Sequence, residues 1–261
     1  MGIAGPRAND ARAARSARVY PKPRRRPVTL VAAQPLSPGV RHLVFRVVDG
    51  EPFEYVAGQW ADLEVPVAGA VIKRPYSIAC APADEAADQF EVAVTHVDGG
   101  PVSTALHALP LGATLEIVGP SGLFTRDKVD PTLPSVFVGT GTGVTPLRAM
   151  LRDELRRAPE GAPMLLVFGA RTENELIFRG ELEELARRHP RFRYEPTLSR
   201  AAADWSGRTG HVQAHLPALL DGLGNGHIYI CGLTKMVTDV RALLKEQLGF
   251  DRRQVHSERY D

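Results

Sequence analysis

The sequence predicts two domains in succession, a small antiparallel β-barrel and an α/β domain built on a parallel sheet. From Val28 onward, short segments rich in Val, Ile and aromatic residues are separated by Gly and Pro, which is typical of short strands. After Pro134, strands alternate with helical segments, which favours a parallel sheet with helices on both faces. The length of 261 residues also fits two ordinary domains. We place the boundary near Asp130, between domains spanning 28–130 and 131–261.

The first domain is predicted to hold short strands and one short helix near Val102–Leu109. The strands are expected at 28–34, 40–48, 60–66, 73–80, 90–97 and 113–118. Strands this short and this dense are typical of a small closed barrel. The segment from Gly119 to Pro131 has the composition of a linker to the second domain.

The second domain is predicted to alternate strand and helix from Ser135 to the chain end. Strands are expected at 135–139, 164–169, 192–198, 228–231 and 255–258. Helices are expected at 144–158, 181–189, 211–220 and 233–248. This alternation implies parallel strands, whose carboxyl ends share one edge of the sheet.

Residues 1–27 differ from both domains because they carry eight basic side chains against Asp10 alone. An Ala- and Arg-rich leader of this kind fits an organellar transit peptide or a disordered tail. Three prolines break any amphipathic helix there and favour the tail. Arg24-Arg25-Arg26 could touch nucleic acid, but the rest of the chain is acidic, so no nucleic-acid partner is expected.

Composition excludes several classes of protein. Two cysteines, Cys80 and Cys231, cannot supply the four thiolates of a plant-type iron–sulfur cluster or of a Cys₄ zinc site. Two cysteines are also too few for a disulfide framework, so we expect the protein to lie in a reducing compartment, the cytoplasm. No apolar run approaches the roughly 18 residues of a membrane span. His211 and His215 lie four residues apart without an accompanying Glu, so no metal site is expected.

A glycine-rich turn is the first functional signal. Its sequence is Gly139-Thr140-Gly141-Thr142-Gly143-Val144-Thr145-Pro146, between a predicted strand and a predicted helix. Backbone without Cβ atoms can approach a phosphate closely, and a helix N-terminus offers free N–H groups. Val144 stands where the strict Rossmann fingerprint has its third Gly. Both a nucleotide site and a plain tight turn fit the segment, and its context favours the nucleotide site.

Three motifs in order carry a family resemblance. Arg74-Pro75-Tyr76-Ser77 lies in a barrel strand, the glycine turn follows, and Cys231-Gly232-Leu233 comes last. Over about residues 28–261 the chain resembles the ferredoxin–NADP reductase family. The resemblance implies an FAD-binding antiparallel barrel domain followed by an NADP-binding α/β domain. FAD and NADP(H) are therefore the expected cofactors.

The resemblance implies FAD contacts in three places. Arg74 suits the pyrophosphate, Tyr76 can stack on the flavin, and Ser77 can hydrogen-bond near its N5. Pro75 belongs to the same motif. The other expected contacts are Thr95, His96 and Val97 on the next strand, and Val102, Ser103 and Thr104 at a phosphate-binding helix start.

In the second domain the resemblance implies a site for the NADP 2′-phosphate. Ser199 and Arg200 would bind it and Arg208 would close the same pocket, although Asp204 nearby is the residue type of an NAD site. We therefore expect NADPH to be preferred to NADH.

The resemblance also places a reacting centre at the ends of the last two strands. Cys231 would lie beside nicotinamide C4, and Gly232 would let the ring approach. Plant-type members end in Glu-x-Tyr, which Glu258 and Tyr260 match, although Asp261 adds one residue. The candidates at the reacting centre are Ser77, Thr142, Cys231, Glu258 and Tyr260.

The resulting functional hypothesis is a flavoprotein oxidoreductase. It would move electrons between NADPH and an acidic one-electron carrier such as ferredoxin, as a monomer. The reductase component of an oxygenase or a free flavin reductase is the alternative on the same fold. A flavin-binding regulatory or electron-transfer subunit of a larger complex is the alternative of another class.

Overall fold

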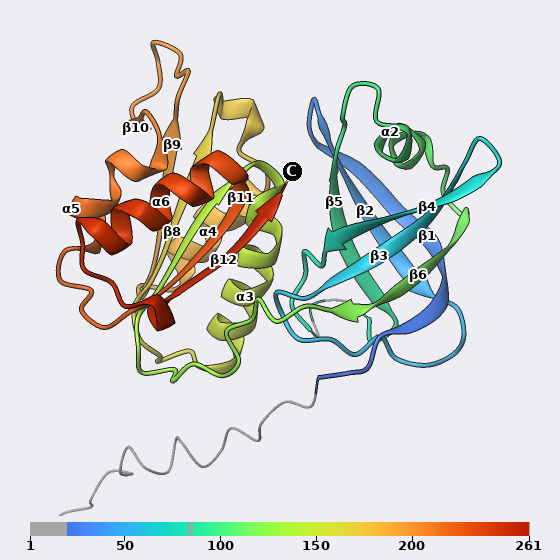
Figure 1. The fold of residues 1–261 in the computed structure, drawn as a ribbon, viewed down its shortest axis with the longest axis horizontal. Helices are drawn as coiled ribbons and strands as arrows, with labels where there is room; N and C mark the ends of the chain where they lie inside the picture. Colours follow the sequence, from blue (N-terminus) through green and yellow to red (C-terminus); the bar gives the residue numbers. More distant parts are fainter. Residues whose placement is uncertain (1–19, 83, 85, 261) are drawn as a thin grey trace, which may run out of the picture.

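The computed structural model describes residues 20–82, 84 and 86–260, which form two lobes, each around a six-stranded sheet (Figure 1). The first lobe is an antiparallel barrel and the second a parallel sheet covered by helices on both faces. The predicted fold class is therefore confirmed. Within the described residues, no helix combines the length and the apolar character that crossing a bilayer requires.

The barrel strands follow the order β4-β3-β6-β1-β2-β5. Their bounds are β1 (Arg24–Ser37), β2 (Val40–Val47), β3 (Trp60–Val67), β4 (Ala70–Ser77), β5 (Gln89–Thr95) and β6 (Thr114–Ser121). The sheet curls so that its edge strands β4 and β5 approach each other, and helix α2 (Pro101–Ala108) packs near one end (Figure 1). Phe45, Phe53 and Phe90 stack inside it, with the rings of Phe53 and Phe90 4.7 Å apart. This packed interior leaves cofactor binding to the rim of the barrel.

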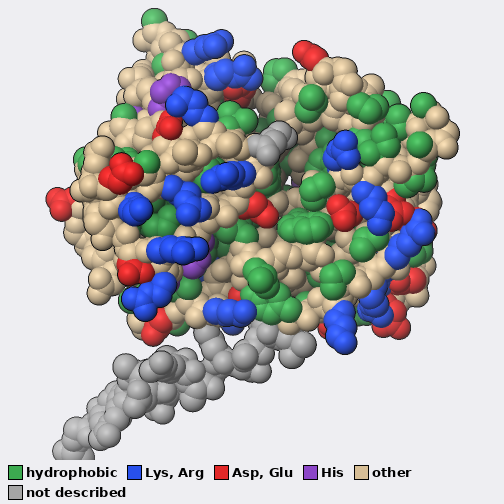
Figure 2. Space-filling view, in the orientation of Figure 1, with side chains coloured by type: hydrophobic (Ala, Val, Ile, Leu, Met, Phe, Trp, Pro, Cys, Tyr) green, Lys and Arg blue, Asp and Glu red, His purple; other side chains and the backbone are tan. Residues whose placement is uncertain are grey.

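The first strand begins earlier than the sequence predicts. Arg24–Arg26 belong to β1, inside the expected tail of residues 1–27, and residues 1–19 lie outside the described residues. Arg26 is 4% exposed, and its Nε donates to Asp49 Oδ2 at 2.7 Å. Arg25 pairs with Glu64 at 2.6 Å. Arg25 and Arg26 therefore join parts of the barrel to one another. On the face of the molecule drawn in Figure 2, Lys and Arg side chains are interspersed with Asp and Glu side chains.

The second sheet has the order β10-β9-β8-β7-β11-β12. Its elements are β7 (Ser135–Thr140), α3 (Val144–Arg157), β8 (Met164–Ala170), α4 (Arg179–Arg188), β9 (Phe192–Leu198), β10 (Arg208–Thr209), α5 (Leu216–Leu220), β11 (His227–Leu233), α6 (Thr234–Glu246) and β12 (Val255–Tyr260). The chain runs outward from β7 through β8 and β9 and then returns to β11 on the other side of β7. Ligands bind at such a switch point in open α/β sheets.

Alternate residues of the central strands face different helices. Phe137 of β7 packs with α3 and α4, whereas Val136 and Val138 pack with α5 and α6. The helix expected over 211–220 is a 3₁₀ turn at Val212–Ala214 followed by α5. Helix α3 lies at the seam between the lobes (Figure 1). Phe124 from the segment after β6 joins the core beneath it, so the two lobes share packed side chains.

Candidate functional site

A cavity of about 700 Å³ opens where β7, β8, β9 and β11 end. It is lined by Thr95, Thr140, Gly141, Thr142, Gly169, Ala170, Arg171, Glu175, Ser199, Gly210, His211, Val212, Gln213, Gly232, Leu233, Lys235, Met236, Asp239 and Tyr260. Thr95 comes from the barrel and the others from the second lobe, so both lobes contribute to the site. The cavity occupies the switch point between β7 and β11, where a dinucleotide is expected.

The glycine turn forms the floor of this cavity. Gly141–Gly143 make a 3₁₀ turn between β7 and α3, and Gly141 has φ +54°. A Cβ on Gly143 would lie 2.5 Å from the Cys231 carbonyl carbon and 2.6 Å from Gly232 Cα. The turn thus needs glycine to pass close to β11. No side chain caps the start of α3; the Val144 N–H donates to the Gly141 and Thr142 carbonyls and Pro146 has no N–H, so the N–H groups of the preceding turn are the ones that could meet a phosphate.

The predicted reacting-centre residues meet at one point. Tyr260 Oη donates a hydrogen bond to Ser77 Oγ across the two lobes. Strands β11 and β12 are parallel, and their register sets Cys231 beside Glu258. Thr142 Oγ1 lies 3.1 Å from Thr95 Oγ1, which gives a second polar contact between the lobes. Side chains 183 residues apart along the chain therefore converge beside the cavity.

The electrostatics at this point are set by burial. Burial raises the pKa of Glu258 to about 7. Burial, and then the charge of Glu258, raise the pKa of the Cys231 thiol well above its usual value. The Cys231 side chain is thus a neutral thiol near pH 7, which suits a positional role and not a nucleophilic one. Burial likewise raises the pKa of Tyr260 well above its usual value, so its hydroxyl remains a donor.

Unsatisfied groups beside the cavity fit a bound cofactor. Glu258 Oε2 and Thr140 Oγ1 are buried without a hydrogen-bond partner among the described residues. Buried polar atoms normally have partners, so a ligand is the natural source of them. Leu233, which lines the cavity, is 65% exposed and offers apolar surface. Such a mixture of apolar surface and a few polar groups is typical of a cofactor site.

The predicted flavin strand is β4. Arg74 and Pro75 are exposed, Tyr76 packs partly against the barrel core, and Ser77 is buried at the strand end. Burial raises the pKa of Tyr76 to about 12. Arg74 Nη1 donates only to the neighbouring Lys73 carbonyl, at 2.8 Å, among the hydrogen bonds of the described chain. Its guanidinium therefore keeps donors for an anion such as a pyrophosphate.

The predicted phosphate-binding helix is α2, whose N-cap is Gly100. Ser103 Oγ accepts from the Val97 amide at 3.1 Å and donates to the Gly100 carbonyl at 3.0 Å. Thr104 Oγ1 donates to the same carbonyl at 2.9 Å, while Val102 is buried. The hydroxyls thus brace the loop after Thr95 and His96 against the helix start. This leaves the backbone N–H groups of that start to a phosphate.

Ser199 and Arg208, which are expected to share the 2′-phosphate pocket, line separate hollows. Ser199 lines the cavity and Arg200 is exposed after it, but Arg208 Nε donates to Glu195 Oε2 at 2.9 Å. Arg208 lines a separate hollow of about 450 Å³ beside Trp205 and Arg179.

The sequence reasoning missed Arg171, which lines the cavity just after β8. The signal was available, because a cation directly after a parallel strand lies at the ligand-binding edge of the sheet. No metal site was expected at His211 and His215. His211 lines the cavity, and His215 Nε2 lies 3.0 Å from the Thr209 carbonyl oxygen.

Two family models match the two lobes. Residues 27–125 match an oxidoreductase FAD-binding domain, and residues 137–242 match an oxidoreductase NAD-binding domain. The cofactor classes implied by the resemblance are thus confirmed. These ranges lie on either side of the boundary expected near Asp130.

Similar proteins include reductases with several kinds of partner. The chain is 53% identical over 238 residues to ferredoxin–NADP reductase B of Sorangium cellulosum (strain So ce56), covering 89% of this chain and 96% of that protein. It is 30% identical to the phenol hydroxylase P5 protein of Acinetobacter pittii (strain PHEA-2), covering 89% of this chain but 64% of that protein. The chain thus spans less than two thirds of the P5 protein.

Solved structures share the fold. The Amycolatopsis cytochrome P450 reductase GcoB superposes with a TM-score of 0.82 at 30% identity, over 93% of this chain and 71% of that one. A ferredoxin NADP⁺ reductase from Neisseria gonorrhoeae superposes with a TM-score of 0.74 at 22% identity, over 90% of this chain and 98% of that one. Together with the 53% identity to ferredoxin–NADP reductase B, this establishes that the chain belongs to the ferredoxin–NADP reductase family of FAD-dependent oxidoreductases.

Proposed function

We propose that this protein transfers electrons between NADPH and ferredoxin through a bound FAD. The observation that carries the proposal is the hydrogen bond from Tyr260 to Ser77 beside the cavity. It joins the end of the predicted flavin strand to the strand beside Cys231, so the two cofactor domains meet at the predicted reacting centre. Ferredoxin is favoured as the partner because the match to ferredoxin–NADP reductase B spans nearly that whole protein.

Each residue at the meeting point has a role in this proposal. When bound, FAD and NADPH supply the redox chemistry, a two-electron exchange between the cofactors and one-electron delivery to ferredoxin. Arg74 binds the pyrophosphate and Ser77 orients the flavin ring by a hydrogen bond. Gly232 would admit the nicotinamide, Gly143 lets the turn pass close to β11, and the Cys231 thiol would contact the ring. Glu258, with a pKa of about 7, can hold or release a proton near neutral pH.

An oxygenase partner is the second candidate. The similarity to the phenol hydroxylase P5 protein supports it, but this chain spans only 64% of that protein. The two cysteines of the chain described here are both buried, so they cannot provide an iron–sulfur cluster that would pass electrons onward. We therefore expect a free carrier to accept the electrons. A cytoplasmic monomer is the assembly and location that we propose.

The decisive experiment is a redox titration of the purified protein. We expect one FAD per chain, bleaching by NADPH at lower concentrations than by NADH, and NADPH-dependent reduction of an added ferredoxin. A colourless protein that cannot be reconstituted with FAD would contradict the proposal. Reduction of an oxygenase component but not of ferredoxin would favour the second candidate.

The preference for NADPH should depend on cations near Ser199. Replacing Arg171 or Arg200 with Ala should raise KM for NADPH by about tenfold or more, since charge-assisted hydrogen bonds contribute about 1.5–3 kcal/mol. The kcat should stay within about twofold, because the 2′-phosphate is remote from the reacting ring. Steady-state kinetics with both dinucleotides measure the change. Unchanged discrimination in both variants would reject the assignment.

Arg208 and Arg193 form a matched pair for the same question, because both bind Glu195. Arg208→Ala should raise KM for NADPH by less than the Arg200 change, because Arg208 must first leave Glu195. Arg193 lines neither the cavity nor the hollow that holds Arg208, so Arg193→Ala should leave KM unchanged.

Tyr260 should act as a gate for the nicotinamide. It pairs with Leu233 in the β11–β12 register and is partly buried, which opposes the idea of a frayed terminal residue. Tyr260→Ser should tighten nicotinamide binding by about 2- to 10-fold, which corresponds to the free energy of one aromatic stacking contact. It should also slow turnover and reduce the discrimination against NADH. Nicotinamide charge-transfer absorbance and steady-state kinetics test this.

Two further variants refine the test of the gate. Tyr260→Phe keeps the ring and loses the bond to Ser77, so it should retain the affinity of the unmodified protein. A chain without Asp261 tests whether that residue restrains the Tyr. If Tyr260→Ser and the shortened chain both behave as the unmodified protein, Tyr260 is not a gate.

A further inference from the structure

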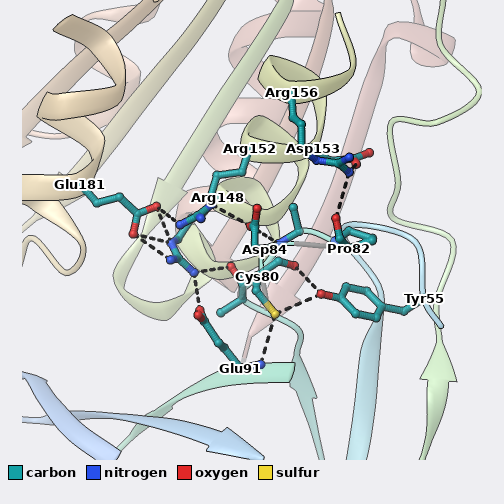
Figure 3. Close-up of polar contacts among 12 residues, drawn as sticks. Tyr55, Cys80, Pro82, Asp84, Glu91, Arg148, Arg152, Asp153, Arg156 and Glu181 are labelled. Atoms are coloured by element: carbon teal, nitrogen blue, oxygen red, sulfur yellow. Dashed lines mark hydrogen bonds and ion pairs between the residues drawn. The ribbon is translucent and has the colours of Figure 1, made fainter. Parts of the chain in front are cut away.

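Helix α3 carries three arginines spaced four residues apart, Arg148, Arg152 and Arg156, and all three reach the barrel (Figure 3). Residues four apart share one face of a helix. Arg148 Nη1 donates to the Ala79 carbonyl at 2.7 Å, Arg152 Nε pairs with Asp84 at 2.7 Å, and Arg156 Nη2 donates to the Pro82 carbonyl at 2.9 Å. One face of α3 is therefore fastened to the segment that follows β4.

Arg148 differs from the other two because it is buried, with 4% of its surface exposed. In its own lobe, Nε and Nη2 bind the Glu181 carboxylate of α4 at 2.9 and 2.7 Å. Toward the barrel, Nη1 binds Glu91 Oε2 of β5 at 2.6 Å as well as the Ala79 carbonyl. Its guanidinium also lies 4.3 Å from the centre of the Phe178 ring. A rigid planar fork thus links both lobes at once.

The barrel side of this contact is itself firmly held. His42 Nε2 lies 3.2 Å from Glu91 Oε2, and the Glu91 amide donates to Cys80 Sγ at 3.2 Å. Tyr55 Oη lies 3.1 Å from the same sulfur (Figure 3). Glu91 is only 5% exposed and alternates along β5 with the core residues Phe90 and Val92, so its carboxylate is buried on the face of the barrel that meets the second lobe. We call Arg148, Glu91, Glu181 and the Ala79 carbonyl the interdomain clamp.

The clamp lies close in sequence to both halves of the site. Arg148 comes two residues after Pro146, the end of the glycine turn, and Ala79 comes two residues after Ser77. The Tyr260 hydrogen bond to Ser77 is a further contact between the lobes, at the end of β4. A rotation of α3 on the barrel would therefore move the glycine turn relative to the end of β4.

We propose that Arg148 is a positioning residue for electron transfer, which sets the orientation of the dinucleotide domain on the flavin domain through the interdomain clamp. The inference rests on the proposed transfer between the two cofactors. Each cofactor binds largely within one lobe, so only the step that crosses the seam depends on this orientation. A lysine keeps the charge but, as a point donor, cannot hold Glu91, Glu181 and the carbonyl in one plane.

The first test compares FAD-loaded Arg148→Lys and Glu181→Gln with Arg157→Lys, an arginine on the same helix that pairs with Asp153 of that helix. Stopped-flow reduction by NADPH should slow about tenfold or more in Arg148→Lys and less in Glu181→Gln, as misplacement of reacting groups does. The Kd for 2′,5′-ADP, which is the adenosine part of NADPH with its 2′- and 5′-phosphates, should change by no more than about twofold, because we expect the second domain alone to hold it. Arg157→Lys should match the unmodified protein.

The second test needs no turnover. Spin labels at exposed Val71 of β4 and Lys245 of α6, introduced as cysteines, report the distance between the lobes by pulsed electron paramagnetic resonance. Native Cys80 and Cys231 are buried, which protects them from labelling. The distance distribution should broaden in Arg148→Lys and keep its width in Arg157→Lys.

The outcomes separate this inference from the proposed function. Folded Arg148→Lys and Glu181→Gln proteins with unchanged flavin reduction and an unchanged distance distribution would overturn the clamp. So would a loss of 2′,5′-ADP affinity as large as the loss of rate, since the defect would then lie within one domain. If Arg148→Lys does not fold, Glu181→Gln alone decides. An unmodified protein that NADPH cannot reduce would contradict the function, whereas the distance distributions would still test the clamp.

Discussion

Replacing Gly143 with Ala should lower NADPH-dependent turnover about 100-fold, because a misplacement of about 1 Å at the reacting groups has an effect of that size. The added Cβ would meet the backbone of Cys231 and Gly232, at 2.5 Å from a carbonyl carbon and 2.6 Å from a Cα. Neither can move without shifting β11 against the turn. We also expect a loss of about 1–3 kcal/mol in the free energy of unfolding, as for other overpacked cores.

The matched control is Gly180→Ala in α4, where a Cβ would meet nothing within 4 Å. That change should leave turnover intact and stabilise the protein by about 0.5–1 kcal/mol through helix propensity. Steady-state kinetics and urea unfolding measure both effects, and the flavin spectrum should be unaltered because the barrel is untouched. Turnover of Gly143→Ala within about twofold of the unmodified protein would show that the close approach is unimportant.

Glu258→Gln should change how stability depends on pH by about 2–3 kcal/mol between pH 5 and 8. Burial raises the pKa of this carboxyl to about 7, so the folded FAD-free protein holds the proton over a range where the unfolded chain has lost it. The contribution of Glu258 to the free energy of unfolding is therefore greatest at low pH and falls as pH rises from about 4.5 through 7. The glutamine variant lacks this loss and should gain relative stability as pH rises.

Urea unfolding of the FAD-free proteins across this pH range is the measurement. Glu246→Gln, at the exposed end of α6, provides a control that should follow the pH curve of the unmodified protein. Parallel curves for Glu258→Gln and the unmodified protein would mean that Glu258 is charged in the fold. If Glu258 exchanges a proton during turnover, Glu258→Gln should also flatten any change of activity with pH near pH 7.

Much of the fold could be predicted because its signals are local. Alternating apolar residues, Gly and Pro breaks and the glycine turn identify strands and helices from a few neighbours along the chain. The meeting of Ser77 with Tyr260 required more, since it joins strands of different domains. Only the resemblance, through the Arg74–Ser77 motif and the terminal Glu-x-Tyr, placed these two residues together.

The features that the sequence does not reveal share one physical origin: the neighbours of an arginine along the chain do not identify the group that it binds. Arg24–Arg26 have the composition of a solvated tail, yet Arg26 is buried and pairs with Asp49, which follows the neighbouring strand β2. Arg208 suits a phosphate by sequence, yet it pairs with Glu195. The arginines of α3 have the spacing of an ordinary solvated helix face. Their role depends on carboxylates and carbonyls supplied by distant segments, which no local pattern encodes.

The hydrogen bond between Tyr260 and Ser77 has a consequence for how the molecule matures. All six barrel strands are complete by Ser121, so the barrel can fold during synthesis while the rest of the chain is still emerging. The bond itself spans 183 residues and needs β12, the last strand described, and contacts of such long range form slowly. Flavin uptake can therefore precede competence for electron transfer, and we expect a newly made molecule to pass through a coloured but inactive stage.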